Sequence, residues 1–318
     1  MIKVGFIGAG DIAYLHGEGV QASSNAQLHG IWNRTRTKAE EKASLFDTRV
    51  FDTAEELIEA VDVVYVLTNM ETHHAYCMQA IEAGKHVLVE KPTAVTIEEI
   101  EEIKAFAHQK GVQVAPVHNY IYEAPVMRAK ELIESGKLGD LVSLHVLYNI
   151  HHPEEVAARY PGVIRQILTH HAYCTLYLVG QPELVSCMKA TVNDGSVPQE
   201  NLAMVTMKMR NQALSHLCAS FAADDHAGDP WTFMIKVIGT KGATRYSYRD
   251  WVENTPAVVH SQTYSAYPYT IRSVGQYFLE QVIGNQHPPL SSLDDAITCM
   301  KIIEACEQSV EEQRHISI

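Results

Sequence analysis

Apolar and polar residues alternate in blocks through the first 117 residues of the chain. Short apolar runs are separated by longer stretches with one apolar face, and Thr53 and Thr96 each precede acidic residues, as at the start of a helix. Strands that alternate with helices form a parallel sheet with right-handed crossovers, so this half is predicted to be an α/β domain. The predicted strands are 2–7, 26–32, 50–51, 61–67, 87–89 and 112–116.

The pattern changes after residue 124. Helices are expected at 124–135, 164–178 and about 292–310, but most segments alternate apolar and polar residues, as half-exposed antiparallel strands do. This half is therefore predicted to be an α+β domain with an open, mainly antiparallel β-sheet. Its expected strands are 141–150, 184–192, 202–209, 213–221 and 231–238.

A chain of 318 residues is too long for one ordinary core and suits two domains. We place them at 1–120 and 121–318, with the last helix able to pack back on the first domain. The net charge of −13 argues against nucleic acid as a partner, because phosphates require a basic face. No apolar run is long enough to span a membrane, and no signal peptide is recognisable. With six scattered cysteines and no C-x-x-C pair, we expect a cytoplasmic protein with reduced thiols.

A glycine motif, G-x-G-x-x-A, joins the first predicted strand to the first helix. Gly8 allows a tight turn, Gly10 allows a pyrophosphate to approach the backbone, and small Ala13 allows the helix to pack closely on the strand. The N–H groups at the start of the helix, at Asp11 and Ile12, are suited to bind phosphates. The first domain is thus predicted to be a Rossmann domain that binds a dinucleotide through these residues.

The choice of cofactor should depend on the end of the second strand. Asn33 stands where an acid would bind the adenosine ribose and repel a 2′-phosphate, and Arg34, Arg36 and Lys38 supply positive charge. NADP(H) is therefore slightly favoured over NAD(H). The alternative is that the segment beginning at Asn33 only turns the chain and caps the next helix.

Lys91 follows a short buried strand and precedes Pro92, which ends the strand. In an open parallel sheet the carboxyl ends of the strands form the ligand crevice, so Lys91 is expected there with Glu90 beside it. A lysine at such a point can lose its proton when desolvated, or donate to a substrate hydroxyl. The alternative is that Lys91 and Glu90 form only a solvated ion pair at the end of the strand.

Four stretches resemble motifs of the Gfo/Idh/MocA oxidoreductases, the family of glucose–fructose oxidoreductase and inositol dehydrogenase. They are AGKHVLVEKP at 83–92, TNMETH at 68–73, ELIESGKLG at 131–139 and VIGTKG at 237–242. The first matches the family's A-G-K-H-V-L-x-E-K-P signature. In the second, Asn69 replaces the usual proline.

The resemblance implies a Rossmann domain followed by a sheet domain that carries substrate and often mediates oligomers. It implies hydride transfer between NAD(P) and a sugar, polyol or related hydroxyl or carbonyl compound. It also implies that further residues bind the cofactor: Thr68, Asn69, His73, Glu90 and Lys91.

A second family signature, D-x-G-x-H-x-x-D, falls at 166–173. Its histidine is kept as His170, but Gln166 and Tyr173 replace the two acids. Because Gln166 has no charge, it cannot raise the basicity of His170 as a carboxylate would. Gln166 can still hydrogen-bond a substrate.

Hydride transfer from an alcohol requires a base for the hydroxyl proton, and the reverse reaction requires an acid. His170 has a suitable intrinsic pKa for both roles, and Lys91 would stabilise negative charge on the reacting oxygen. Asn119 and Tyr120 end the last Rossmann strand and are expected to face the substrate, as is Gln166. Without the alignment to the family signature, His170 would be interpreted as a structural histidine on an apolar helix.

No metal site is expected, because the residues of an adjacent histidine pair project in different directions. The tyrosine-rich run 264–269 could stack on a sugar, although packing at a sheet edge or a subunit interface is favoured. Met204, Val205 and Met207 suggest an exposed apolar face, and we expect a homodimer or homotetramer.

Two functions fit these observations. The first is an NAD(P)-dependent sugar or polyol oxidoreductase that uses Lys91 and His170. The second is a non-catalytic ligand sensor or regulatory binding protein on the same fold, suggested by the loss of the acids at Gln166 and Tyr173.

Overall fold

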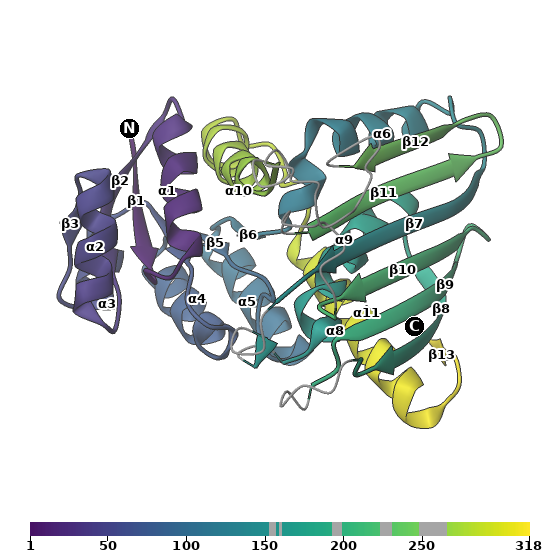
Figure 1. The fold of residues 1–318 in the computed structure, drawn as a ribbon. Coiled ribbons are helices and arrows are strands. Elements are labelled where there is room, and N and C mark those ends of the chain that lie inside the picture. The colour runs from purple at the N-terminus through teal and green to yellow at the C-terminus, as the bar shows by residue number, and fades with distance from the viewer. Residues whose placement is uncertain (153–156, 159–160, 193–198, 223–230, 248–265) are drawn as a thin grey trace, which may run out of the picture. The chain divides into compact units, whose positions relative to one another are not determined.

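The computed structural model describes residues 1–152, 157–158, 161–192, 199–222, 231–247 and 266–318 (Figure 1). The chain divides into two compact units. Unit 1 comprises Met1–Tyr122 and Pro268–Ile297, and unit 2 comprises Glu123–Tyr267 and Thr298–Ile318. The segment Pro268–Ile297, which the sequence pattern assigns to the second domain, is thus grouped by its contacts with the first unit.

Unit 1 contains a parallel six-stranded sheet, which confirms the predicted Rossmann architecture. Its strand order is β3-β2-β1-β4-β5-β6, and every neighbouring pair runs parallel. Strand β4 is buried at every position, as expected for a strand covered on both faces. The bounds are β1 Ile2–Ile7, β2 Ala26–Trp32, β3 Arg49–Val50, β4 Val63–Val66, β5 His86–Val89 and β6 Val114–Pro116.

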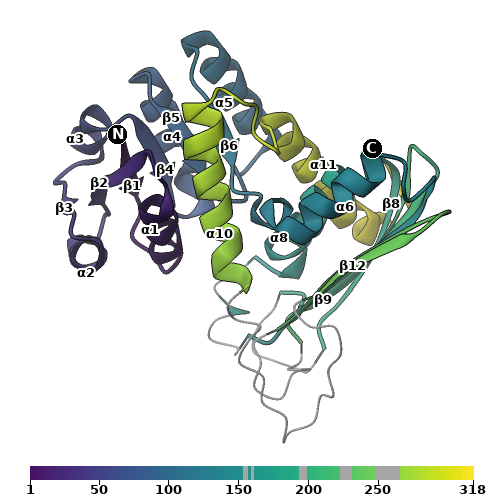
Figure 2. The same cartoon turned by 90° about the horizontal axis from the view of Figure 1, so that it is seen from above.

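The helices of unit 1 form two layers, one on each face of the sheet (Figure 2). Helix α1 packs against α2, and α4 packs against α3 and α5. The predicted caps are present, since Thr53 and Thr96 accept hydrogen bonds from the N–H groups of Glu56 and Glu99. The bounds are α1 Ile12–Ala22, α2 Arg36–Phe46, α3 Ala54–Ala60, α4 His73–Glu82 and α5 Ile97–Lys110.

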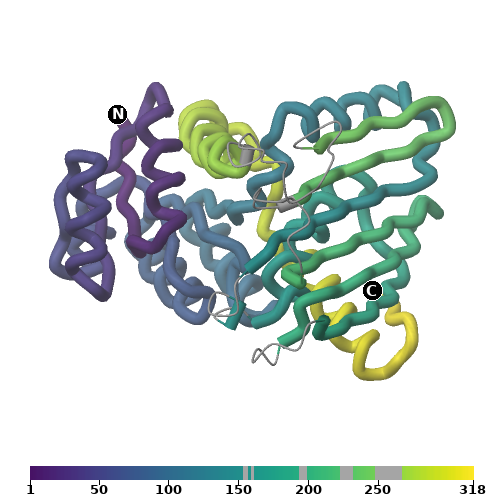
Figure 3. The backbone as a smooth tube through the Cα atoms, in the orientation of Figure 1, coloured from purple at the N-terminus to yellow at the C-terminus, as the bar shows by residue number. Residues whose placement is uncertain are grey.

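Helix α10, Ala266–Tyr277, lies beside α1 (Figure 3). A Cβ on Gly19 of α1 would lie 3.2 Å from the Arg272 backbone, so glycine allows the two helices to approach closely. The described part of the tyrosine-rich run belongs to α10 and not to a sheet edge, and Tyr269 is exposed there. Tyr264 and Ser265 lie outside the described residues, and the expected subunit interface stays a prediction.

Unit 2 contains a seven-stranded sheet of order β12-β11-β7-β10-β9-β8-β13. Every neighbouring pair is antiparallel except β10 and β7, so the sheet is mixed and mainly antiparallel, as predicted. The predicted strands are present, and the short strands β12 and β13 are additional. The bounds are β7 Leu141–Ile150, β8 Pro182–Ala190, β9 Leu202–Met209, β10 Leu214–Ser220, β11 Trp231–Gly239, β12 Ala243–Ser247 and β13 Ile316–Ser317.

Helices cover one face of this sheet, where α8 and α9 contact β9, β10 and β7. The expected helix at 164–178 is interrupted at Ile167, which separates α8 from α9. The bounds are α6 Ala124–Glu134, α8 Val163–Gln166, α9 Leu168–Val179 and α11 Leu293–Glu312. Within the described residues, no helix is both long and apolar enough to span a membrane.

The other face of the sheet carries an apolar row. Met188, Met204 and Cys218 are register neighbours on β8, β9 and β10, and the row continues to Leu147 and Met234 on β7 and β11. Met188 is 77% exposed and Met204 is 47% exposed. Val205 and Met207, which were expected on the same face as Met204, are buried in the core because side chains alternate along a strand.

Candidate functional site

The glycine turn lies where the strand order of unit 1 reverses, between β1 and β4. Gly8 has a φ of 115°, and a Cβ there would lie 2.7 Å from the carbonyl carbon and oxygen of Leu67, so only glycine fits. At Gly10 a Cβ would meet nothing within 4 Å. The backbone at Gly10 thus faces open space at the point where doubly wound sheets bind nucleotides.

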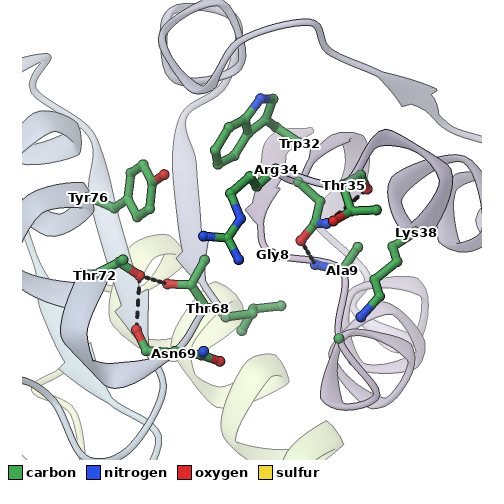
Figure 4. Close-up of a pocket in the computed structure, with 13 residues that line it drawn as sticks. Gly8, Ala9, Trp32, Arg34, Thr35, Lys38, Thr68, Asn69, Thr72 and Tyr76 are labelled. Carbon is green, nitrogen blue, oxygen red and sulfur yellow. Dashed lines mark hydrogen bonds between the residues drawn. The ribbon is translucent and has the colours of Figure 1, made fainter.

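A pocket of about 250 Å³ opens beside this turn (Figure 4). The loops after β1, β2 and β4 form its walls, and Trp32 and Tyr76 meet edge to face with ring centroids 5.6 Å apart. Of the predicted cofactor residues, the pocket brings together Gly8, Gly10, Asn33, Arg34, Thr68 and Asn69. Asp11, Ile12, His73, Glu90 and Lys91 are not among its lining residues.

Asn33 connects two walls of the pocket. Its Oδ1 accepts a hydrogen bond from Ala9 N at 3.1 Å, and its Nδ2 donates to Thr35 O at 2.9 Å. The amide therefore holds the glycine turn against the loop after β2. That bracing is compatible with the predicted ribose contact, because each amide atom retains hydrogen-bonding capacity.

Arg34 and Lys38 bring positive charge to the pocket. Both are exposed, and neither side chain forms a hydrogen bond or ion pair with another described residue. Arg36, the third expected cation, contacts Glu40 at 2.9 Å and also Asp52, and it does not line the pocket. Figure 4 shows Arg34 extending among the lining side chains between Trp32 and Thr68.

The residues of the pocket fit a nicotinamide dinucleotide. Open backbone at Gly10, the start of α1 and the cations of the loop after β2 are all suited to phosphate groups. Thr72 Oγ1 lies 2.7 Å from Thr68 Oγ1 and 2.9 Å from Asn69 O, which orders the opposite wall. The exposed amide of Asn69 remains available to a ligand.

A second group of polar residues surrounds Lys91, which is half-buried just after β5. Burial lowers the pKa of Lys91 to about 8, against the opposing effect of the Glu90 charge. Burial, followed by the charge of Lys91, lowers the pKa of His118 to about 3. His118 Nδ1 lies 2.6 Å from Ser291 Oγ and is therefore a neutral, hydrogen-bonded neighbour of Lys91.

His73 connects the loop after β4 to the loop after β5. Its Nε2 lies 2.9 Å from Thr68 O, and its Nδ1 lies 2.9 Å from Pro92 O. A carbonyl oxygen only accepts, so the ring donates to both only when both nitrogens carry protons. His73 thus supports the pocket wall at Thr68 from behind and lies beside the Lys91 loop.

Asn119 and Tyr120 are both buried, with exposures of 1% and 0%. Asn119 Nδ2 donates a hydrogen bond to Thr270 Oγ1 at the start of α10. Both side chains lie in the interior after β6, where α10, which is distant in sequence, supplies a partner to Asn119. Their predicted contact with a substrate stays a prediction.

In unit 2, His170 is buried on α9 and its Nδ1 lies 2.7 Å from the Tyr173 hydroxyl. Tyr148 packs against the imidazole, with ring centroids 6.0 Å apart. Gln166 is half-buried at the end of α8. Tyr173, which replaces the family's last acid, is therefore a hydrogen-bond partner of His170.

Sequence reasoning missed His16, His118 and the role of Tyr173. His16 lies on α1 within the buried stripe formed by Ala13, Gly17 and Val20. His16 could have been recognised from the sequence as a polar residue in this stripe, because a buried polar side chain requires a partner. Among the described residues, no group of three or more His, Cys, Asp and Glu side chains is placed to hold a metal ion.

Comparisons with known proteins agree with this architecture. Residues 2–118 match the family described as an oxidoreductase family with an NAD-binding Rossmann fold. Residues 126–245 match the GFO/IDH/MocA C-terminal domain. The first match lies in unit 1 and the second in unit 2, and neither extends beyond residue 245.

Glucose-6-phosphate 3-dehydrogenase of Bacillus subtilis (strain 168) is 26% identical over 263 residues, which are 77% of this chain and 74% of that protein. The scyllo-inositol 2-dehydrogenase (NADP(+)) IolW of the same organism is 34% identical over 195 residues, 58% of this chain and 54% of that protein. The structure of scyllo-inositol dehydrogenase from Lactobacillus casei, with bound NAD(H) and scyllo-inositol, has a TM-score of 0.85 at 17% identity and covers 100% of this chain and 99% of that chain.

The chain belongs to the Gfo/Idh/MocA family of oxidoreductases. It is accordingly an NAD(P)-dependent oxidoreductase, as its sequence motifs predicted.

Proposed function

We propose that the protein is an NAD(P)-dependent dehydrogenase or reductase that acts on the CH–OH group of a sugar, polyol or related compound. The pocket at the strand reversal of unit 1 carries this proposal, since its open glycine backbone and unpaired cations suit a dinucleotide. The two relatives described above, a sugar-phosphate dehydrogenase and an inositol dehydrogenase, support the substrate class.

NADP(H) is the preferred cofactor in this proposal. Arg34 and Lys38 have no partner among the described residues, so a 2′-phosphate would neutralise them without breaking an existing ion pair. Asn33 carries no charge that would repel this phosphate. The related scyllo-inositol 2-dehydrogenase (NADP(+)) IolW, which is 34% identical, is named for this cofactor.

Lys91 and His170 both act on the reacting oxygen of the substrate. When bound, the nicotinamide supplies the hydride or receives it. Lys91 donates a hydrogen bond that stabilises negative charge on the oxygen, and its pKa of about 8 keeps it mostly protonated at neutral pH. His170 takes the hydroxyl proton in oxidation and returns it in reduction.

Tyr173 permits both roles of His170. A tyrosine hydroxyl can donate to Nδ1 or accept from it, whereas a carboxylate only accepts. His170 can therefore present either tautomer to the substrate, and Gln166 of the neighbouring α8 hydrogen-bonds a substrate hydroxyl in this proposal. In the proposed site, Asn119 and Tyr120, which follow β6, also bind the substrate.

The apolar row on unit 2 supports a homodimer or homotetramer. Met188 and Met204 are exposed in adjacent strands, and a second copy of this chain would cover them. The proposed partners are thus a small polyol or sugar and further copies of the chain.

Absorbance of reduced nicotinamide tests the function directly. The protein is mixed with NADP+ or NAD+ and a panel of inositols, sugars and sugar phosphates. An increase in absorbance is expected with at least one polyol. With that substrate, His170→Ala should lower the rate about 10²–10⁴-fold and Lys91→Ala about 10²–10³-fold. Near wild-type turnover in both variants would refute the assignment, and tight sugar binding without turnover would indicate a sensor.

A further inference from the structure

We propose that His16 is a positioning residue that holds the carboxylate of Glu90 in place and, through it, controls the ammonium group of Lys91. The inference rests on the proposed function, in which Lys91 acts on the substrate. It adds a residue from α1, the helix that follows the glycine turn, to the support of that lysine.

A short hydrogen bond joins His16 to Glu90. Nε2 of His16 lies 2.9 Å from Oε1 of Glu90, and the His16 side chain is completely buried. The two residues are 74 positions apart in sequence, so the contact connects α1 to the end of β5. A carboxylate only accepts hydrogen bonds, so Nε2 is the atom that carries the ring proton.

Two aromatic residues fix the orientation of the imidazole. Phe6 and Tyr65 both meet the ring edge to face, at centroid distances of 6.5 Å and 5.6 Å. Nδ1 of His16 is buried and has no hydrogen-bond partner among the described residues. An apolar side chain would fill the same stripe without leaving a buried nitrogen unpaired, so space filling alone does not explain a histidine here.

The same carboxylate also binds the backbone of the next residue. Oε2 of Glu90 accepts a hydrogen bond from Lys91 N at 3.0 Å. His16 thus holds one oxygen of Glu90, and the backbone N–H of Lys91 holds the other. Rotation of the carboxylate would release both contacts.

The charge of Glu90 depends on these donors. Burial opposes ionisation of Glu90, but the hydrogen bond from His16, together with the charge and the backbone N–H of Lys91, holds its pKa below the usual range. The negative charge in turn raises the pKa of Lys91, which burial alone would lower further. His118, which also faces Lys91, is neutral and adds no charge at neutral pH.

Titration of Lys91 in matched variants tests this chain of contacts. Lysines are reductively methylated with ¹³C-formaldehyde, which keeps their charge. The pKa of Lys91 is then read by NMR, and its signal is assigned by its loss in Lys91→Ala. His16→Gln places an amide N–H near the position of Nε2. His16→Asn is one carbon shorter and cannot reach Glu90.

We expect Glu90→Gln to lower the pKa of Lys91 by about one unit or more, because it removes the charge of Glu90. His16→Asn keeps that charge but releases one oxygen of the carboxylate, so it should lower the pKa of Lys91 by a smaller amount. The double variant should show the same shift as Glu90→Gln alone, because His16 acts only through the Glu90 carboxylate. His16→Gln should titrate close to wild type. An unchanged titration in His16→Asn, or shifts that add in the double variant, would overturn the proposal.

Lys91 is titrated without turnover, so the two proposals can fail separately. If the titrations behave as expected but Lys91→Ala turns over at the wild-type rate, the proposed function fails and the role of His16 stands. If Lys91→Ala loses turnover but His16→Asn leaves the titration of Lys91 unchanged, the proposed function stands and the role of His16 fails.

Circular dichroism checks that each variant folds. If His16→Asn does not fold, ¹H–¹⁵N NMR of the histidine rings in the wild-type protein tests the same bond. We expect a proton on Nε2 of His16 whose signal shifts in Glu90→Gln. A ring without a proton on Nε2 would overturn the proposal.

Discussion

Replacement of Arg34 by alanine should weaken the binding of NADP(H) and leave that of NAD(H) nearly unchanged. Arg34 lines the pocket of unit 1 from the loop after β2. Its exposed guanidinium has no partner among the described residues, so its removal should not perturb the fold. The whole effect should therefore appear at the 2′-phosphate, which NAD(H) lacks.

The expected magnitude follows from the contact that would be lost. A hydrogen bond to a charged group contributes about 1.5–3 kcal/mol, and about 1.4 kcal/mol corresponds to a factor of ten in affinity. The loss should therefore be about 10–100-fold at low salt. Because Arg34 is exposed, screening should reduce the effect as ionic strength rises.

Isothermal titration calorimetry with NADP+ and NAD+ measures both dissociation constants without a substrate. Arg36→Ala is the matched control, because Arg36 lies two positions away but is bound to Glu40 and Asp52. It should leave the ratio of the two constants unchanged. An unaltered ratio in Arg34→Ala, or an equal change in both variants, would refute this account of specificity.

Other predictions concern charge, tautomer, assembly and cofactor choice. Because the pKa of Lys91 is lowered to about 8, the rate of carbonyl reduction should fall as pH rises above that value and Lys91 loses its proton; a profile that stays flat to alkaline pH would contradict a donor role. Tyr173→Phe removes the bond to Nδ1 of His170 and should lower turnover by up to about tenfold and shift the limb of the pH–rate profile due to His170; an unchanged profile would show that the bond is only structural. Met204→Glu, in the exposed apolar row, should shift sedimentation toward the monomer, and a wild-type monomer at micromolar concentration would rule out this interface. Asn33→Asp should favour NAD(H), because the carboxylate repels a 2′-phosphate; an unchanged preference would remove Asn33 from the ribose site.

Local pattern was enough to determine much of this protein. The parallel sheet of unit 1 follows from apolar runs separated by capped helices, because strands buried on both faces leave a continuous apolar signal. Gly8 could be identified from the motif alone. The structure gives the reason for a glycine there, because the φ of 115° and the contact with Leu67 exclude a side chain. The alternating strands of unit 2 could also be recognised, but which of the two faces is covered depends on packing. Val205 and Met207 share the buried face of β9, and Met204 lies on the opposite, exposed face.

Contacts between residues distant in sequence were decided only by the tertiary structure. Helix α10 returns to unit 1, where Thr270 binds Asn119 after β6, and no local periodicity reveals that partner. His16 and Glu90 belong to different elements, and the fold brings them to 2.9 Å. Lys91 could be identified from the sequence, because its motif consists of neighbouring residues. The pKa of Lys91 depends on burial and on the Glu90 charge, and these arise only when α1 and β5 pack in one interior.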